Sequence, residues 1–194
     1  MKKKIKINRK WILHTFLMTF ILAVIFSIVS EALIRQVNIV VAILLLLVIV
    51  SVGVFFDAIG IAVAAADEKP FHAMAASRVK SAKYSIRLLK NASKVSNFCN
   101  DVIGDIAGIV SGTTIGIIMG FFKQYNIDPE IQVYITIAFS GVVAALTVGG
   151  KAFGKEIAIS KSKEVVDLTG KVIYFFDVLT LKKTFAHNVK IRKE

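Results

Sequence analysis

An apolar stretch between residues 97 and 122 carries the polar side chains best suited to chemistry in this chain. Asn97, Asp101 and Asp105 are spaced four residues apart, so an α-helix would place them on one stripe. An ionised Asp near a bilayer centre costs about 2.5–3.5 kcal/mol on insertion scales, and such residues usually mark the path of an ion, a proton or a substrate. The spacing therefore predicts a functional polar stripe inside an apolar helix.

A further carboxylate lies in an earlier apolar run. Asp57 follows Phe55 and Phe56 and would also lie at membrane depth. Hard cations such as Mg²⁺ bind oxygen ligands and usually keep several waters, so a few carboxylates and amides are enough to form a site. We therefore expect a metal site with the ligands Asp57, Asn100, Asp101 and Asp105, tuned by Asn97 and Lys151.

Two other interpretations of these acids stay open at this point. Lys151 lies at the end of the last apolar run and would neutralise the acids if it paired with one of them. The polar residues would then form a structural network rather than a cation site. Alternatively, Asp101 is exposed at the boundary between membrane and water, because a basic segment precedes it closely.

Glycines recur every fourth residue along the same stretch. Small residues at this spacing allow the backbones of two membrane helices to approach closely. We expect such a crossing, either within the chain or across a homodimer. The glycines are Gly104, Gly108, Gly112, Gly116 and Gly120.

The composition is that of a membrane protein. Of 194 residues, 56% are hydrophobic and 20% are charged, and the mean hydropathy is +0.70. Four stretches, residues 11–30, 39–66, 98–122 and 131–150, are long enough to cross a hydrocarbon core of about 30 Å at about 20 residues each. The sequence predicts an all-α membrane protein with four transmembrane helices, of which the first is an uncleaved signal anchor.

Lysine and arginine are confined to the segments outside these apolar runs. There are six before the first run, seven in residues 67–95 and ten from residue 151 onward, against one in each remaining connection. By the positive-inside rule, both termini are cytoplasmic in a multi-pass protein of the cell membrane. A net charge of +12 distributed in this way indicates membrane lipids, and not nucleic acid, as partners.

Two connecting segments have amphipathic helical patterns. Residues 70–95 form a predicted juxtamembrane helix whose basic face meets lipid headgroups or cytoplasmic solvent. Residues 161–194 form a second amphipathic helix and a basic tail, with Phe175 and Phe176 apolar enough to lie on a membrane. The predicted organisation is a basic terminus over 1–10, the anchor over 11–36, a core over 37–160 and this tail. The basic face consists of Lys80, Lys83, Arg87, Lys90 and Lys94.

Three short segments resemble the transmembrane domain of the cyclin M and CorB/CorC magnesium transporters. That family has patterns like F-F-S-G-S-E-T-A, G-N-x-L-V-N and G-E-x-x-P-K-x-x-A, with a basic juxtamembrane helix after the first of them. Residues 55–62 read FFDAIGIA, residues 99–104 read CNDVIG, and residues 150–158 read GKAFGKEIA. The order of the spans is similar as well.

The chain departs from these motifs at Asp57, Ile59, Gly60, Gly104 and Lys151. Of the positions that bind cations in the family, Asn100 matches outright. The resemblance implies a homodimeric, CorB-like core that lacks CBS domains and transports Mg²⁺.

The function expected from the sequence is therefore transport of a divalent cation, with Mg²⁺ as substrate. One alternative is a scaffold or regulator without transport activity that dimerises through the glycines. Another is a proton-coupled carrier that uses Asp101 and Asp105 as a relay. We expect neither an enzyme nor a bound cofactor, because no nucleophile set, Walker loop or dinucleotide fingerprint is present and Cys99 is the single cysteine.

Overall fold

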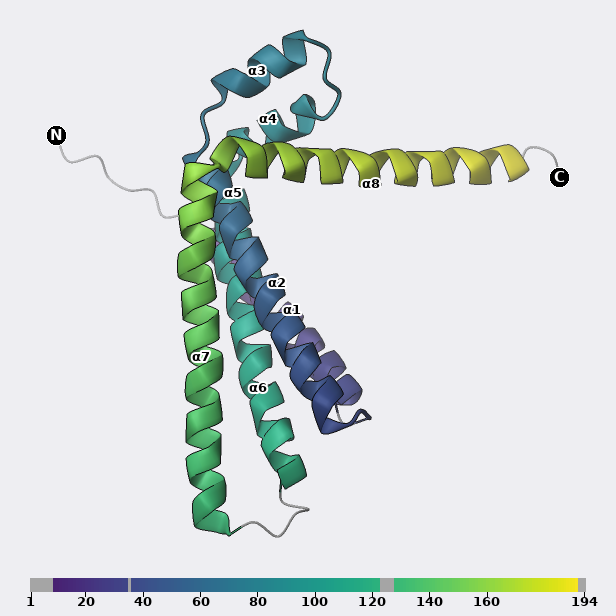
Figure 1. Ribbon diagram of the computed structural model, residues 1–194. Coiled ribbons are helices and arrows are strands. Elements are labelled where there is room, and N and C mark those ends of the chain that lie inside the picture. Colours follow the sequence, from purple (N-terminus) through teal and green to yellow (C-terminus); the bar gives the residue numbers. More distant parts are fainter. Residues whose placement is uncertain (1–8, 35, 123–127, 192–194) are drawn as a thin grey trace. The chain divides into compact units, whose positions relative to one another are not determined.

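The computed structural model describes residues 9–34, 36–122 and 128–191, with side chains for 13, 15–34, 36–122 and 128–179 (Figure 1). These residues are almost entirely helical and contain no strand. The elements in chain order are α1 (Arg9–Ile34), α2 (Ile39–Ala65), α3 (Lys69–Ala76), α4 (Ala82–Lys90), α5 (Ala92–Asn97), the π-helix η1 (Phe98–Gly104), α6 (Asp105–Phe122), α7 (Pro129–Ser160) and α8 (Ser162–Ile191).

Four helical stretches are long and apolar enough to cross a membrane. They lie in α1, in α2, in the continuous run from α5 through η1 to α6, and in α7. The predicted all-α membrane protein with four spans is thereby confirmed. The last span is longer than predicted, because α7 continues past residue 150 to Ser160.

The chain divides into two compact units. The first contains the described parts of residues 1–54 and 102–150. In it, α1 packs along α6, and a separate apolar cluster joins α2 to α6 and α7. Large apolar side chains remain exposed on the outer faces of α1, α2 and α7, as is typical of helices surrounded by lipid. The buried members of the cluster are Ile34, Ala42, Leu46, Val50, Ile115, Ile118, Met119 and Val143.

The buried hydroxyl groups of α6 are satisfied within the helix itself. Ser111 donates to the carbonyl of Ala107 at 2.6 Å, and Thr114 donates to the carbonyl of Val110 at 2.8 Å. Such bonds to the preceding turn leave no hydroxyl unpaired in an apolar environment. The hydroxyls of Ser111 and Thr114 therefore need no hydrogen-bond partner from another element.

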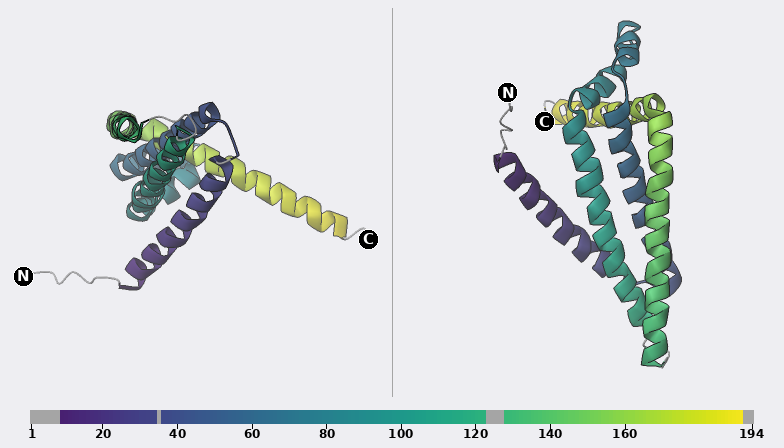
Figure 2. Two further views of the ribbon diagram at one scale, coloured as in Figure 1. Left: turned by 90° about the horizontal axis from the view of Figure 1, so that it is seen from below. Right: turned by 90° about the vertical axis from the view of Figure 1, so that its left-hand side faces the viewer.

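The second unit contains residues 55–101 and the described part of 151–194. Its core surrounds the fully buried ring of Phe71 in α3. The ends of α2 and α7, together with α4 and α8, contribute the other apolar side chains. In Figures 1 and 2, α8 runs across the end of α7 rather than along it. The buried members are Ile59, Ala62, Val63, Phe71, Leu89, Cys99, Ala158 and Val166.

A close crossing joins α4 to α8 in this unit. The hydroxyl of Ser85 donates to the carbonyl of Val166 at 3.3 Å, and a Cβ at Gly170 would collide with the same hydroxyl. Farther along, the hydroxyl of Tyr84 donates a hydrogen bond to the carboxylate of Asp177. The pKa of Tyr84 is raised above its ordinary value of 10.0, mainly by this hydrogen bond. Desolvation of the phenol raises the pKa further.

The predicted single juxtamembrane helix over 70–95 is wrong, because three short helices, α3, α4 and α5, replace it. Helix α3 ends in a Schellman motif. The amide of Val79 donates to the carbonyl of Met74, and the amide of Arg78 donates to the carbonyl of Ala75, each at 3.0 Å. Arg78 has φ 61°, the left-handed conformation that glycine usually supplies at this position. Hydrophobic spacing alone gave no signal for this break.

Candidate functional site

Helix α2 and the π-helix η1 meet at Gly60 and Asn100. A Cβ at Gly60 would collide with the side-chain oxygen of Asn100 and lie 3.1 Å from the Cβ of Cys99. Glycine is therefore the residue that allows Asn100 to turn its amide toward α2. Both residues belong to the second unit.

The Asn100 amide is satisfied on one side only. Its nitrogen donates to the hydroxyl of Ser96, about one helical turn earlier, at 3.4 Å. Its oxygen Oδ1 is buried and has no hydrogen-bond partner among the described residues. Leaving a buried acceptor unpaired costs about 1–3 kcal/mol, so a donor or a cation at this oxygen would stabilise the crossing.

The backbone at Asn100 is a seven-residue π-helix between two α-helices. The continuous α-helix predicted through Asn97, Asp101 and Asp105 is therefore wrong, since α5 ends at Asn97 and α6 begins at Asp105; that the three side chains share one stripe stays a prediction. Short π-helical segments inside α-helices are rare and occur frequently at functional sites. Periodicity assumes a constant α-helical turn, so it could not reveal this segment.

The three membrane-depth acids do not form a cluster with one another. Asp101 and Asp105 are exposed, and Asp57 is half-buried on α2, three residues before Gly60. The described part of the chain contains no group of three His, Cys, Asp or Glu side chains arranged to hold a metal ion. The predicted cluster of three carboxylates is therefore wrong. When Asn100 points inward, the next residue, Asp101, is turned away from the same neighbour.

Lys151 and Asn97 do not complete a charged network either. Both are half-buried. Among the residues with described side chains, no ion pair joins Lys151 to Asp57, Asp101 or Asp105; the pairs seen outside the spans are His72 with Glu68 and Lys171 with Asp167. The interpretation in which Lys151 neutralises the acids is not supported by these contacts.

The glycine series on α6 is largely open. Within the described chain, no atom of another element lies within 4 Å of a Cβ placed at Gly108, Gly112, Gly116 or Gly120. The close approach expected within the chain is therefore wrong at these positions, and a crossing between two copies stays a prediction. Gly104 is buried, and its carbonyl oxygen lies 3.9 Å from a Cβ placed at Gly53.

The close helix contacts lie at glycines that sequence reasoning did not assign to packing. A Cβ at Gly53 would lie 2.8 Å from the Cβ of Ala107, and one at Gly150 would lie 3.0 Å from Val54. A Cβ at Gly60 would collide with the side-chain oxygen of Asn100, and one at Gly170 with the hydroxyl of Ser85. Isolated glycines have no periodic pattern, so nothing in the sequence marked them.

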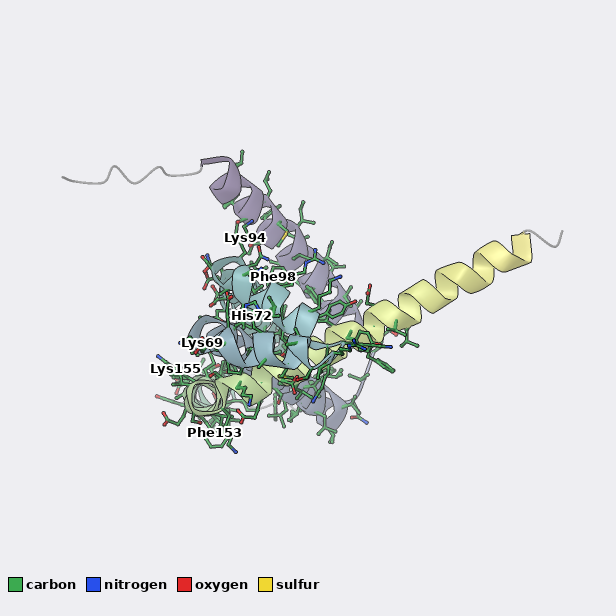
Figure 3. All side chains as sticks on the ribbon, turned by 90° about the horizontal axis from the view of Figure 1, so that it is seen from above. Lys69, His72, Lys94, Phe98, Phe153 and Lys155 are labelled. Atoms are coloured by element: carbon green, nitrogen blue, oxygen red, sulfur yellow. The ribbon has the colours of Figure 1, made fainter. Side chains whose placement is uncertain are left out.

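The five basic residues of the predicted juxtamembrane face are all exposed and lie outside this site. Figure 3 shows Lys94 at the edge of the second unit, and Lys69 and Lys155 likewise project outward. The five basic residues of the predicted face form a surface for solvent or headgroups and contribute no ligand to Asn100. The five are Lys80, Lys83, Arg87, Lys90 and Lys94.

Comparison with protein-family models, curated proteins and solved structures found no match. The class that the fold defines is a multi-pass α-helical membrane protein. Any function must therefore be argued from the site itself.

Proposed function

We propose that this chain is the membrane core of a divalent-cation transporter, with Mg²⁺ as its substrate, and that the ion passes the Gly60–Asn100 crossing. The observation that carries the proposal is the buried, unpartnered Oδ1 of Asn100 in a membrane-spanning segment. A carbonyl oxygen without a donor is suited to a cation, because it needs no deprotonation and has a free lone pair.

The surroundings of this oxygen favour a divalent ion that keeps part of its water. Asp57 lies three residues before Gly60 on the same helix and supplies negative charge. Mg²⁺ usually binds through one or two carboxylates and retains several waters, so it does not require a cage of protein ligands. Asn100 as a direct ligand and Asp57 as a charge partner form a minimal site of this kind.

The resemblance to the cyclin M and CorB/CorC transporters supports the same residue. Asn100 matches a cation-binding position of that family, and Gly60 stands where the family pattern has glutamate. Glycine thus leaves room where the family pattern has an acidic side chain. Asp57 provides a carboxylate about one helical turn away. From the positive-inside rule we infer that both termini lie in the cytoplasm, and we propose the cell membrane as the location.

Mg²⁺ flux into proteoliposomes tests the proposal. Asn100→Leu keeps the branching and the number of heavy side-chain atoms and removes the oxygen, so we expect uptake to require about 10- to 100-fold more Mg²⁺, the equivalent of about 1.5–3 kcal/mol. Gly141→Ala is the matched control, because no other element of the described chain lies within 4 Å of a Cβ placed there. An absence of flux in the wild type, or equal flux in Asn100→Leu, contradicts the proposal.

The open glycine face favours one competing function, a scaffold that dimerises without transport. It rests on the empty space beside Gly108, Gly112, Gly116 and Gly120. This scaffold predicts that Gly112→Leu lowers the dimer fraction in detergent, while Asn100→Leu changes nothing that can be measured. The two proposals are thus distinguished by which single substitution has an effect.

A further inference from the structure

Helix α8 has two opposite faces, of which one is covered. The covered face is formed by Val166, Gly170, Tyr174 and Asp177, which meet Ser85 and Tyr84 of α4 through hydrogen bonds, a ring contact and the close crossing at Gly170. These positions follow one another at spacings of four, four and three residues, so they share one side of the helix.

The opposite side is apolar and exposed. Leu168, Val172, Phe175 and Leu179 are each between 47% and 60% exposed. Each lies one or two residues from a member of the covered face, and two residues correspond to about 200° around an α-helix. We call these four residues the apolar stripe of α8.

The position of α8 directly after a membrane span fixes where this stripe lies. Only Lys161 separates α8 from α7. Phe153 and Ile159 are exposed apolar residues in the last turns of α7, so the apolar surroundings of the span reach its end. Lys151 and Lys155 are compatible with this position, because long basic side chains extend toward headgroups. Helix α8 therefore begins at the membrane boundary.

The apolar stripe lies on the side of α8 opposite α4. Figures 1 and 2 show α4 on one side of α8 and the end of α7 extending from the other. Since α4 covers the face of Gly170 and Tyr174, the stripe lies on the side of the last turns of α7, which belong to the same unit as α8.

We propose that α8 is an interfacial helix that lies on the bilayer with its apolar stripe among the lipid chains, and that α4 rests on its outer face. The basic side chains of α4 then point away from the bilayer. Arg87 and Lys83 are exposed, whereas Ser85 and Leu89, on the other side of α4, are buried. The charged face of α4 is therefore a cytoplasmic surface and not a headgroup contact. This inference does not depend on cation transport.

Quenching of a single tryptophan by brominated lipid tests the proposal in the full chain. Trp11→Phe removes the native tryptophan, and Phe175→Trp or Leu168→Trp then places one on the stripe. Vesicles contain equal parts of phosphatidylcholine and phosphatidylglycerol, brominated near the headgroup end of the chains. Interfacial helices insert about 5–10 Å, so both variants should lose most of their fluorescence.

Arg87→Trp in the same background is the matched control, and it should keep its fluorescence. Equal quenching at positions 87 and 175, or none at positions 168 and 175, would overturn the proposal. A second copy as the true occupant would be revealed by disulfide cross-linking of Phe175→Cys in a Cys99→Ala chain without lipid quenching. That result would also overturn it.

Discussion

At the scale of single residues, Asn100 shows how a small neighbour creates a polar site. Gly60 leaves room for the amide, Ser96 binds its nitrogen, and the oxygen remains without a partner. The unpaired oxygen costs stability, and a protein retains such a group most readily where a ligand completes it. Asp101 and Asp105, by contrast, are exposed on the surface of the chain and take no part in this pairing.

Tyr84 provides a residue-scale prediction about pH. Its pKa in the folded chain is raised, first by the hydrogen bond to Asp177, so the protonated phenol is favoured by folding. The contact between α4 and α8 should therefore be fully present below a pH of about 10 and be lost as the pH rises through the raised pKa. Alkaline absorbance titration should show one late-titrating tyrosine, which Tyr84→Phe removes.

The partner of Tyr84 can be tested in the same titration. Asp177→Ala should return the late component to the ordinary range, whereas Glu164→Ala, an exposed carboxylate elsewhere on α8, should leave it unchanged. A late tyrosine that persists without Asp177 would contradict this assignment.

At the scale of elements, the turn after α3 is a place where the chain is conformationally strained. Arg78 occupies the left-handed region, which costs an L-residue about 1–2 kcal/mol. Arg78→Gly should therefore raise the free energy of unfolding by up to about 1 kcal/mol, because glycine adopts this conformation without a Cβ penalty. Chemical unfolding in detergent, followed by circular dichroism, measures the change.

A glycine one turn earlier should have the opposite effect. Ala75→Gly lies inside α3 and is exposed, so it should cost about 0.5–1 kcal/mol. If both substitutions destabilised the protein equally, the left-handed turn at Arg78 would not be the source of strain.

The elements also show what sequence patterns can and cannot predict. The spans were predictable, because a bilayer requires about 20 apolar residues in a row whatever their contacts are. The break at Arg78 and the π-helix around Asn100 were not, because both depend on local hydrogen bonding that leaves hydrophobic spacing almost unchanged. Asn100 itself was predicted as a ligand, whereas its pairing with Gly60 depends on how two distant segments pack.

At the scale of the whole molecule, the two units are built from different elements. The first unit is built from membrane spans whose outer faces are apolar. The second unit holds the short helices, α8 and the unpaired side-chain oxygen of Asn100. The candidate ion site thus belongs to the same unit as the helices that we place at the cytoplasmic surface, which is where a transported cation would enter or leave.

Calorimetric titration of Mg²⁺ into the detergent-purified chain measures the proposed site most directly. We expect wild type and Gly141→Ala to bind with equal affinity. Gly60→Ala should bind about tenfold more weakly or worse, because its methyl group displaces the Asn100 oxygen from the position in which it would bind the ion. Mg²⁺ binding of equal strength in Gly60→Ala and wild type, or no binding to either, would contradict a cation site at Asn100.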